Sequence, residues 1–453
     1  MRSFSFKTIF WHILPALLAL GAGILLIKIA YIEDAFEMWA LSTTVVCGLF
    51  LGVFLLLRPL ETTLVYFALS PLLQVLNDAS LPVPGSTVTF SFGGVMLTVI
   101  LICGGTSCLR KPGAPFPEAK KVFSLFLILA SWMLITILLN LKDLVILRSL
   151  KELGRIMGVF VLFAVGLKYS RGAKEIDKLL FALFGSLLIP VGVAVWQILF
   201  GTQYIELENF NRVMGTFGIP NMFGMYLIFP LTVLFQLSFG NHARGVYMPL
   251  TWSALLLLMV VLFFTYTRAS WLAFLLGSLY MGFRRYKRFI PLIVLPILLL
   301  FPLMSPERLR LGSTGSSGRI GLWSALIPAG LSSPVFGHGL MSMPSFSKSL
   351  FGFSNQGQNQ FLLYWIEGGF VGVMLLGLLL ISLFHGLGRC YSQLPEGVYK
   401  DFYIAFMAAL LGITAIAFFE SNAIFQPWVW LPAGVFLGAG PGLMKDHGAC
   451  CTT

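Results

Sequence analysis

The chain contains 453 residues, of which 58% are hydrophobic and only 11% are charged. Soluble domains carry about 25% charged residues, so this composition excludes a water-soluble globular protein. The formal net charge is +12, and the basic residues lie in short intervals between long apolar runs, which indicates membrane topology and no nucleic-acid partner.

Apolar runs of about 20 residues, the length that crosses a hydrocarbon core of about 30 Å, follow one another along the chain. We expect an all-α integral membrane protein, a single polytopic domain over residues 1–453 with about 12–14 transmembrane helices. The first run is too long for the apolar segment of a cleavable signal peptide, and the shorter runs are expected to be tilted, re-entrant or incomplete crossings. The candidate spans are 9–30, 38–57, 61–76, 91–109, 122–141, 155–168, 179–200, 220–239, 250–267, 269–283, 289–303, 359–385, 402–419 and 424–443.

The distribution of basic residues predicts the orientation. If both termini lie in the cytoplasm and every span crosses, the cytoplasmic segments hold most of the lysines and arginines, among them RRYKR at 284–288. This distribution is the one that the positive-inside rule describes. The sequence therefore predicts cytoplasmic termini and places the long segment 304–358, which is rich in glycine and serine, on the outer side.

Neither a metal site nor a cofactor is expected. The five histidines are scattered, and no spacing of His and Cys typical of a metal site occurs. The sequence also lacks a glycine-rich loop of the kind that cradles nucleotide phosphates. An activity driven by nucleotide hydrolysis is therefore not predicted.

Three arginines on the predicted outer side are candidates for binding an anion. Arg212, Arg268 and Arg319 lie on the side where the topology rule disfavours positive charge. A guanidinium group binds phosphate oxygens through two parallel hydrogen bonds and stays charged when partly desolvated. Three converging arginines at the membrane interface would suit a lipid-linked pyrophosphate, whereas single arginines would pair with a nearby acid or a lipid headgroup.

Four short segments form an ordered series in the second half of the chain. Residues 212–221 read RVMGTFGIPN, and residues 265–271 read TYTRASW. Residues 317–339 contain SGR, a tryptophan and PVFGHG, and residues 358–372 begin with QNQFL and end with EGGFVG. Together they resemble the motifs of the O-antigen ligase and O-antigen polymerase family of bacterial envelopes. The resemblance covers residues 205–385, and the N-terminal half is similar only in its hydropathy.

The resemblance implies a metal-independent integral membrane glycosyltransferase with the C-type architecture. Its donor would be an undecaprenyl-pyrophosphate-linked glycan at the outer (periplasmic) face of the bacterial cytoplasmic (inner) membrane, with a chain-length regulator as a further partner in some members. We expect polymerisation of lipid-linked oligosaccharide repeat units into O-antigen, capsule or exopolysaccharide. The alternative is an O-antigen ligase that transfers glycan from the lipid carrier to lipid A core or another acceptor.

The resemblance also assigns roles to individual residues. Arg212 and Arg319 would bind and stabilise the pyrophosphate, with Arg268 supporting them, because charge develops on the departing phosphate oxygens. The tryptophans of the motifs would stack on a sugar face. The residues expected to bind substrate are Gln358, Asn359, Glu367, Trp271, Trp323 and His338.

One residue departs from the family pattern. Gln358 occupies the place where the family commonly has a histidine, and an amide cannot take a proton at neutral pH. His338 or Glu367 would then serve as the base, or the acceptor hydroxyl would react with little base assistance. For Glu367, inside an apolar span, an ion pair with Arg268 is the competing interpretation. Glu420, at the end of a span, is expected to be a solvent contact.

Two other classes of protein remain open. A transporter of an anionic solute would also use arginines, but transporters usually show ionisable residues near the midplane or broken helices in paired positions. A structural membrane protein with a long outer loop would leave Arg212, Arg268 and Arg319 apart. The relative position of these three side chains therefore separates the predicted site from a purely structural role.

Overall fold

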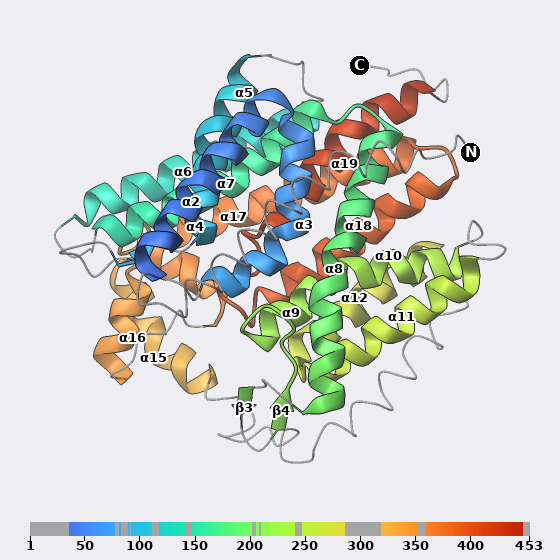
Figure 1. Ribbon diagram of the computed structural model, residues 1–453. Coiled ribbons are helices and arrows are strands. Elements are labelled where there is room, and N and C mark those ends of the chain that lie inside the picture. Colours follow the sequence, from blue (N-terminus) through green and yellow to red (C-terminus); the bar gives the residue numbers. More distant parts are fainter. Residues whose placement is uncertain are drawn as a thin grey trace.

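The computed structural model describes residues 36–77, 81–82, 89–90, 92–110, 117–141, 146–201, 205–207, 210–240, 247–285, 319–351 and 358–446 (Figure 1). The predicted spans 9–30 and 289–303, and residues 304–318 and 352–357 of the predicted outer loop, lie outside the described residues. The described helices are α2 (Phe36–Leu57), α3 (Pro59–Asn77), α4 (Phe92–Val99), the π-helix η1 (Ile100–Gly104), α5 (Gly105–Arg110), α6 (Pro117–Leu139), α7 (Ile146–Tyr169), α8 (Ala173–Phe200), α9 (Pro220–Tyr226), α10 (Ile228–Phe239), α11 (Tyr247–Phe264), α12 (Arg268–Arg285), α15 (Arg319–Ser332), α16 (Met343–Phe351), α17 (Gln360–Gln393), α18 (Val398–Ile416) and α19 (Pro427–Asp446).

The all-α fold class is confirmed, because every predicted span within the described residues corresponds to one or more helices. The shortest predicted spans, 61–76, 155–168 and 269–283, lie within α3, α7 and α12, which have 19, 24 and 18 residues. The run 91–109 is divided into α4, η1 and α5. The sequence did not predict two short antiparallel pairs, β1 (Leu81–Pro82) with β2 (Thr89–Phe90) and β3 (Ile205–Leu207) with β4 (Phe210–Arg212).

The apolar helices make this an integral membrane protein. Five helical segments among the described residues are long and apolar enough to cross a membrane. Large apolar side chains stand exposed on them, for example Leu188 of α8 at 74% and Ile381 of α17 at 66%. Lipid solvates such faces, because helices satisfy their own backbone polar groups. The five segments are Pro117–Leu139, Ala173–Phe200, Pro220–Phe239, Gln360–Gln393 and Val398–Ile416.

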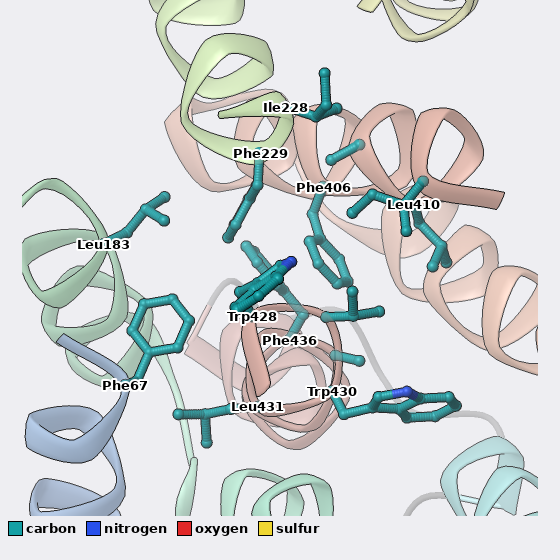
Figure 2. Packing of buried hydrophobic residues seen from close by; sticks show 14 of the residues in the cluster. Phe67, Leu183, Ile228, Phe229, Phe406, Leu410, Trp428, Trp430, Leu431 and Phe436 are labelled. Carbon is teal, nitrogen blue, oxygen red and sulfur yellow. The ribbon is translucent and has the colours of Figure 1, made fainter. Parts of the chain in front are cut away.

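A large part of the core is built around α19. Side chains from α3, α8, α10 and α18 point toward this helix and fill the space around it (Figure 2). The Phe406 and Phe436 rings stack with their centroids 5.1 Å apart, and the Trp428 indole packs edge-to-face with the Tyr226 ring at 5.5 Å. Because Tyr226 ends α9, this packing fixes α9 against the core.

The helices α19 and α7 pack backbone to backbone through glycines four residues apart. A Cβ atom at Gly434 would lie 2.2 Å from the Phe163 carbonyl oxygen, and one at Gly438 would lie 2.4 Å from the Leu167 carbonyl oxygen. Small residues at this spacing allow membrane helices to approach closely. The start of α19, and with it the end of the loop from α18, is thereby held beside α7.

Ion pairs join helix ends that the predicted topology assigns to the same side. Lys178 of α8 contacts Glu61 of α3 at 2.9 Å, and Arg285 of α12 contacts Asp401 of α18 at 2.9 Å. All four lie in or beside segments predicted to be cytoplasmic. Helix α12 begins with Arg268 and ends with Arg285, so its 18 residues separate the two arginines by about 26 Å. The arginines of the predicted outer side therefore lie at the opposite end of the helices.

Candidate functional site

Arg212, the last residue of β4, is followed by a turn that neighbouring elements hold in place. The Gln197 side-chain oxygen of α8 accepts hydrogen bonds from the Met214 and Gly215 N–H groups at 3.1 and 3.0 Å. Gly215 has a φ of +58°, a left-handed conformation that favours glycine. This turn leads the chain from β4 toward α9, and it explains the glycine of the RVMG segment.

The Arg212 guanidinium group joins two segments of the chain. Its Nε donates to the Thr265 carbonyl oxygen at 3.0 Å, and its Nη2 donates to Asn221 Oδ1 at 2.6 Å and to Thr267 Oγ1 at 3.2 Å. Both threonines lie in the turn between α11 and α12, where Tyr266 has a φ of +49°. A left-handed tyrosine is strained. The strained turn presents the Thr265 carbonyl and the Thr267 hydroxyl to the same guanidinium group.

Arg268 and Arg319 are the first residues of α12 and α15, and the charge of Arg268 acts on Arg319. Arg319 Nε donates to Gln358 Oε1 at 2.6 Å, and its Nη2 donates to Glu420 Oε1 at 3.3 Å. Gln358 has a φ of +47°, so it too adopts a backbone conformation that is uncommon for a residue other than glycine. Arg319 thus ties helix α15 to the start of α17 and to Glu420.

Glu420 lies at the centre of these side chains. Its Oε1 accepts hydrogen bonds from Asn221 Nδ2 at 2.6 Å and from Arg319 Nη2 at 3.3 Å. Asn221 in turn accepts from Arg212, so the carboxylate is linked to one arginine directly and to a second through an amide. We call the following residues the arginine cluster: Arg212, Asn221, Thr267, Arg268, Arg319, Gln358 and Glu420.

The loop between α18 and α19 holds Glu420 in position. On its far side, the Ile424 N–H donates to the Gln360 side-chain oxygen of α17 at 2.8 Å. Arg155 of α7 donates to the Phe425 carbonyl oxygen, also at 2.8 Å. These bonds fix the loop against α7 and α17, so that Glu420 lies at a defined place between the arginines.

The arginine cluster is partly buried and contains charged groups that affect one another. Burial raises the pKa of the Glu420 carboxyl above its ordinary value, while Arg319, Asn221 and Arg212 offset part of this shift. Burial and the positive charge of Arg268 lower the pKa of the Arg319 guanidinium, and Glu420 acts in the opposite direction. The Arg319 and Glu420 side chains are 20% and 21% exposed, so a ligand can reach both. An anion bound here would relieve the repulsion between Arg268 and Arg319.

Hydrogen bonds through Asn221 and Glu420 link Arg212 to Arg319, which also bonds to Gln358, and the charge of Arg268 acts on Arg319. Their roles toward a substrate stay a prediction. The expectation that Glu420 is a solvent contact is wrong, because its carboxylate is bonded to two side chains of the arginine cluster.

Asn359 has a structural role at the start of α17. Its Oδ1 accepts hydrogen bonds from the Phe361 and Leu362 N–H groups, both at 3.0 Å. This is the arrangement of an N-cap, which satisfies backbone donors that the first turn of a helix leaves free. A contact of Asn359 with an acceptor therefore stays a prediction that involves its amide nitrogen.

Glu367 and His338 lie where the end of α15 and the turn after it dock on a kink in α17. The kink is at Gly369, which has φ +66° and ψ −170°. A Cβ atom at Gly369 would lie 2.0 Å from the Val335 carbonyl oxygen, and the His338 N–H donates to the Ile366 carbonyl oxygen at 2.8 Å. The glycines of the PVFGHG and EGGFVG segments thus serve a close backbone contact between the turn after α15 and α17.

The side chains of Glu367 and His338 belong to this docking contact. Glu367 is 1% exposed, and the Met341 and Met343 N–H groups face its carboxylate. Within the described residues, no contact joins it to Arg268, so the competing ion pair is not observed. The His338 Nε2 lies 2.8 Å from the Ala329 carbonyl oxygen. The structure therefore places both residues apart from the hydrogen bonds of the arginine cluster.

The two tryptophans differ in their surroundings. Trp271 is 6% exposed and packs edge-to-face with Phe263 in the main core, with ring centroids 6.2 Å apart. Trp323 of α15 is partly buried and packs with Trp365 against the small apolar cluster between α15, α16 and α17. The stacking on a sugar that the sequence predicts is therefore open to Trp323 and sterically blocked for Trp271 in this conformation.

Sequence reasoning missed the functional candidates Glu420 and Thr267, and it gave Asn221 no role. A signal for Glu420 was present, because it is the acidic residue of FFESN at the end of an apolar span on the predicted outer side. A carboxylate on the same side as several unexplained arginines is a candidate partner for them. The hydrogen bond of Asn221 depends on tertiary structure and has no sequence signal.

Comparison with known families supports the resemblance. Residues 253–377 match a family described as O-Antigen ligase, and no curated protein matches the chain. The matched residues include Arg268, Arg319 and Gln358, whereas Arg212 and Glu420 lie outside them. The match confirms the family resemblance over this region and supports a ligase or polymerase type of enzyme in general, with a lipid-linked glycan as its substrate class, in a bacterial membrane.

Proposed function

We propose that this chain is a polymerase that extends a cell-surface polysaccharide. It transfers an oligosaccharide from polyprenyl pyrophosphate to a hydroxyl group of another lipid-linked repeat unit. The observation that carries the proposal is the arginine cluster, in which Arg212 and Arg319 approach Glu420 from two sides. The matched family supplies the reaction class, and the guanidinium groups supply a binding site for the leaving group.

The reaction follows from the chemistry of the donor. The acceptor hydroxyl attacks the anomeric carbon, and the lipid pyrophosphate leaves with the electron pair of the broken bond. Arg212 and Arg319 stabilise the charge that develops on the phosphate oxygens, and they do so without a metal ion. Helices α12 and α15 begin at Arg268 and Arg319, so the positive ends of two helix dipoles add to the attraction.

We further propose that the arginine cluster lies on the outer face of the cytoplasmic membrane and that both termini are cytoplasmic. Helix α12 begins at the arginine cluster, and its last turn carries Arg284 and Arg285. Helix α19 begins beside the loop that holds Glu420, and its last turn carries Lys445. Basic residues are retained on the cytoplasmic side of a membrane, and this rule supports an outer position for the arginine cluster.

The test is a reconstitution with natural substrate. Lipid-linked glycans are extracted from host cells that lack this chain, mixed with the purified protein in vesicles, and separated on a gel. A ladder of increasing lengths that both Arg319→Ala and Arg212→Ala abolish would support the polymerase. Arg389→Ala, at the other end of α17, serves as the control because it removes an arginine paired with Glu118 away from the arginine cluster.

Other products would point to other functions. A single shifted band that forms only after lipid A core is added would identify a ligase. Movement of labelled substrate across the bilayer without any new glycosidic bond would contradict the enzyme and favour a transporter of an anionic solute. A ladder that persists in Arg319→Ala and Arg212→Ala would retain the polymerase but exclude the arginine cluster as its site.

A further inference from the structure

Glu420 differs chemically from every other member of the arginine cluster. The remaining members are three arginines, two amides and a threonine, and none of these accepts a proton near neutral pH. The carboxylate is the single group in the arginine cluster that does so. A hydroxyl that attacks an anomeric carbon must lose its proton during or after bond formation, and a positioned carboxylate is a suitable acceptor.

The two oxygens of Glu420 are in different states. Asn221 Nδ2 and Arg319 Nη2 both donate to Oε1. Among the described residues, none donates a hydrogen bond to Oε2. One oxygen is therefore anchored, which fixes the orientation of the carboxylate, while the other is available to a ligand. The side chain is 21% exposed, so an acceptor can reach it.

The position of Glu420 beside Arg319 also fits this task. Arg319 lies 3.3 Å from the carboxylate, so a pyrophosphate bound to Arg319 would lie next to Glu420. Among the described residues, the charged groups that act on Glu420 are Arg319 of α15 and Arg212 of β4. When a pyrophosphate engages these two arginines, their positive charge no longer favours the ionised carboxylate, and Glu420 becomes a stronger base.

On the proposed function, we infer that Glu420 is the catalytic base that takes the proton of the acceptor hydroxyl. The hydroxyl oxygen forms the new bond to the anomeric carbon, and its proton passes to Glu420 Oε2. The bond between the anomeric carbon and the phosphate oxygen breaks, and its electron pair stays on the lipid pyrophosphate that Arg319 and Arg212 hold. The proton then leaves Glu420 for water, which restores the carboxylate.

The test separates binding from turnover. Glu420→Gln keeps the shape and an acceptor oxygen for Asn221 and Arg319, but it cannot take a proton. We expect turnover on the extracted lipid-linked glycans to fall about 10²–10⁴-fold. The affinity for undecaprenyl pyrophosphate, used as the binding probe, stays within a few-fold of the native value. The native rate should decline toward acid pH as a carboxyl group becomes protonated, and this decline should be absent in Glu420→Gln. Glu420→Asp should retain part of the activity and the acid decline.

Three results would overturn the inference. One is turnover of Glu420→Gln within a few-fold of the native chain. The second is an unchanged acid decline in that variant, and the third is a loss of undecaprenyl pyrophosphate binding as large as in Arg319→Ala with unchanged maximal turnover. The third result would make Glu420 a residue that only positions the arginines. The thermal unfolding of each variant, with Glu396→Gln as a carboxylate control far from the arginine cluster, shows whether it folds.

The same experiment distinguishes this inference from the proposed function. If the native chain forms product while Glu420→Gln is fully active, only the role of Glu420 is wrong. If the native chain forms no product from any acceptor, the proposed function and the role of Glu420 are both wrong.

Discussion

Arg285 and Arg319 are equally buried arginines at opposite ends of the molecule, with side chains 18% and 20% exposed. Arg285 lies between two carboxylates, 2.9 Å from Asp401 and 3.1 Å from Glu396. Among the described residues, Arg319 pairs with one carboxylate, Glu420, at the longer distance of 3.3 Å. An arginine thus has two acidic partners at one end of the molecule, whereas at the other end an arginine has a single, more distant one.

The difference is the one expected between an arginine that stabilises the fold and one that binds a ligand, the role proposed for Arg319. The charge of Arg285 is compensated within the protein. Burial lowers the pKa of the Arg319 guanidinium, and Glu420 acts in the opposite direction. The like charge of Arg268 lowers this pKa further. Such an arrangement costs stability, and proteins retain this cost where a site must bind or react. On the proposed function, a pyrophosphate bound between Arg268 and Arg319 would reduce this repulsion.

The largest effect should come from exchanging the two arginines for alanine one at a time. Arg319→Ala should lower turnover about 10²–10³-fold, because it removes a donor aimed at developing charge, and should leave the unfolding temperature nearly unchanged. Arg285→Ala should leave turnover per folded molecule unchanged and should lower the unfolding temperature, because Asp401, at 2% exposure, would lose a partner. Turnover and thermal unfolding are measured on the same preparations.

The opposite pattern would break the comparison. If Arg319→Ala mainly destabilised the protein and Arg285→Ala mainly reduced turnover, the active site would lie at the Arg285 end of the molecule and not at the arginine cluster. Arg319→Lys sharpens the result further. It keeps the charge but loses the planar fork, so partial activity would indicate that geometry as well as charge is required.

A second pair of variants tests the close backbone contact that supports the arginine cluster. Gly369→Ala would place a Cβ atom 2.0 Å from the Val335 carbonyl oxygen and has a left-handed φ, so it should destabilise the protein by several kcal/mol and displace α15. Gly377→Ala, two turns further along α17, meets no atom within 4 Å and should be neutral or stabilising by up to about 1 kcal/mol. Thermal unfolding measures both, and equal effects would show that the contact of Gly369 with the turn after α15 is unimportant.

A third test uses pH. The effect of removing a carboxylate on stability should have opposite signs at Glu420 and at Glu396, which lie at the two ends of the molecule. Burial raises the pKa of Glu420, so the folded state binds this proton more readily than the unfolded state, and stability falls as pH rises above the ordinary carboxyl pKa. Glu420→Gln should therefore unfold at a higher temperature than the native chain at neutral pH, and the difference should shrink toward acid.

Glu396 supplies the contrast for the pH test. Its hydrogen bond with Lys400 lowers the pKa of the Glu396 carboxyl, so it contributes stability at neutral pH that is lost as pH falls through the lowered pKa. Glu396→Gln should unfold at a slightly lower temperature than the native chain, because Glu396 is 72% exposed and its ion pairs are screened. If the unfolding temperatures of both variants shift in the same direction, the two carboxylates do not differ in their effect on stability as their contacts indicate.

The sequence predicted the helices well because lipid imposes a simple rule on length and polarity. The runs 122–141 and 402–419 differ from α6 and α18 by only a few residues at either end. The π-helical turn η1 inside the run 91–109 was not predictable, since a π-helix arises from packing and leaves the apolar pattern intact. The close contact of α19 with α7 was hidden for a related reason, because glycines in an apolar helix do not identify their partner.

The sequence identified the arginines of the candidate site but not the carboxylate at its centre. Arg212, Arg268 and Arg319 stood out because positive charge on the predicted outer side needs a reason. Glu420 did not, because a single acid at the end of a span has an ordinary explanation in solvent. Its place in the arginine cluster is visible only in the structure, where Arg319 and Asn221 bond to the same oxygen of Glu420. These residues precede Glu420 in the sequence by about 100 and about 200 positions. Long-range hydrogen bonds of this kind leave no local pattern.

The smallest expected effect concerns Asn359, which the sequence assigned to the acceptor and the structure places as the N-cap of α17. Asn359→Ala should cost about 0.5–2 kcal/mol of stability, because the Phe361 and Leu362 N–H groups lose their acceptor. Asn359→Asp keeps the cap, since aspartate is an equally good N-cap, but removes the amide nitrogen. If Asn359 only caps the helix, Asn359→Asp should retain the native stability and the native KM for the acceptor. A raised acceptor KM at native stability would instead show that the amide nitrogen binds the acceptor, beside Gln358 of the arginine cluster.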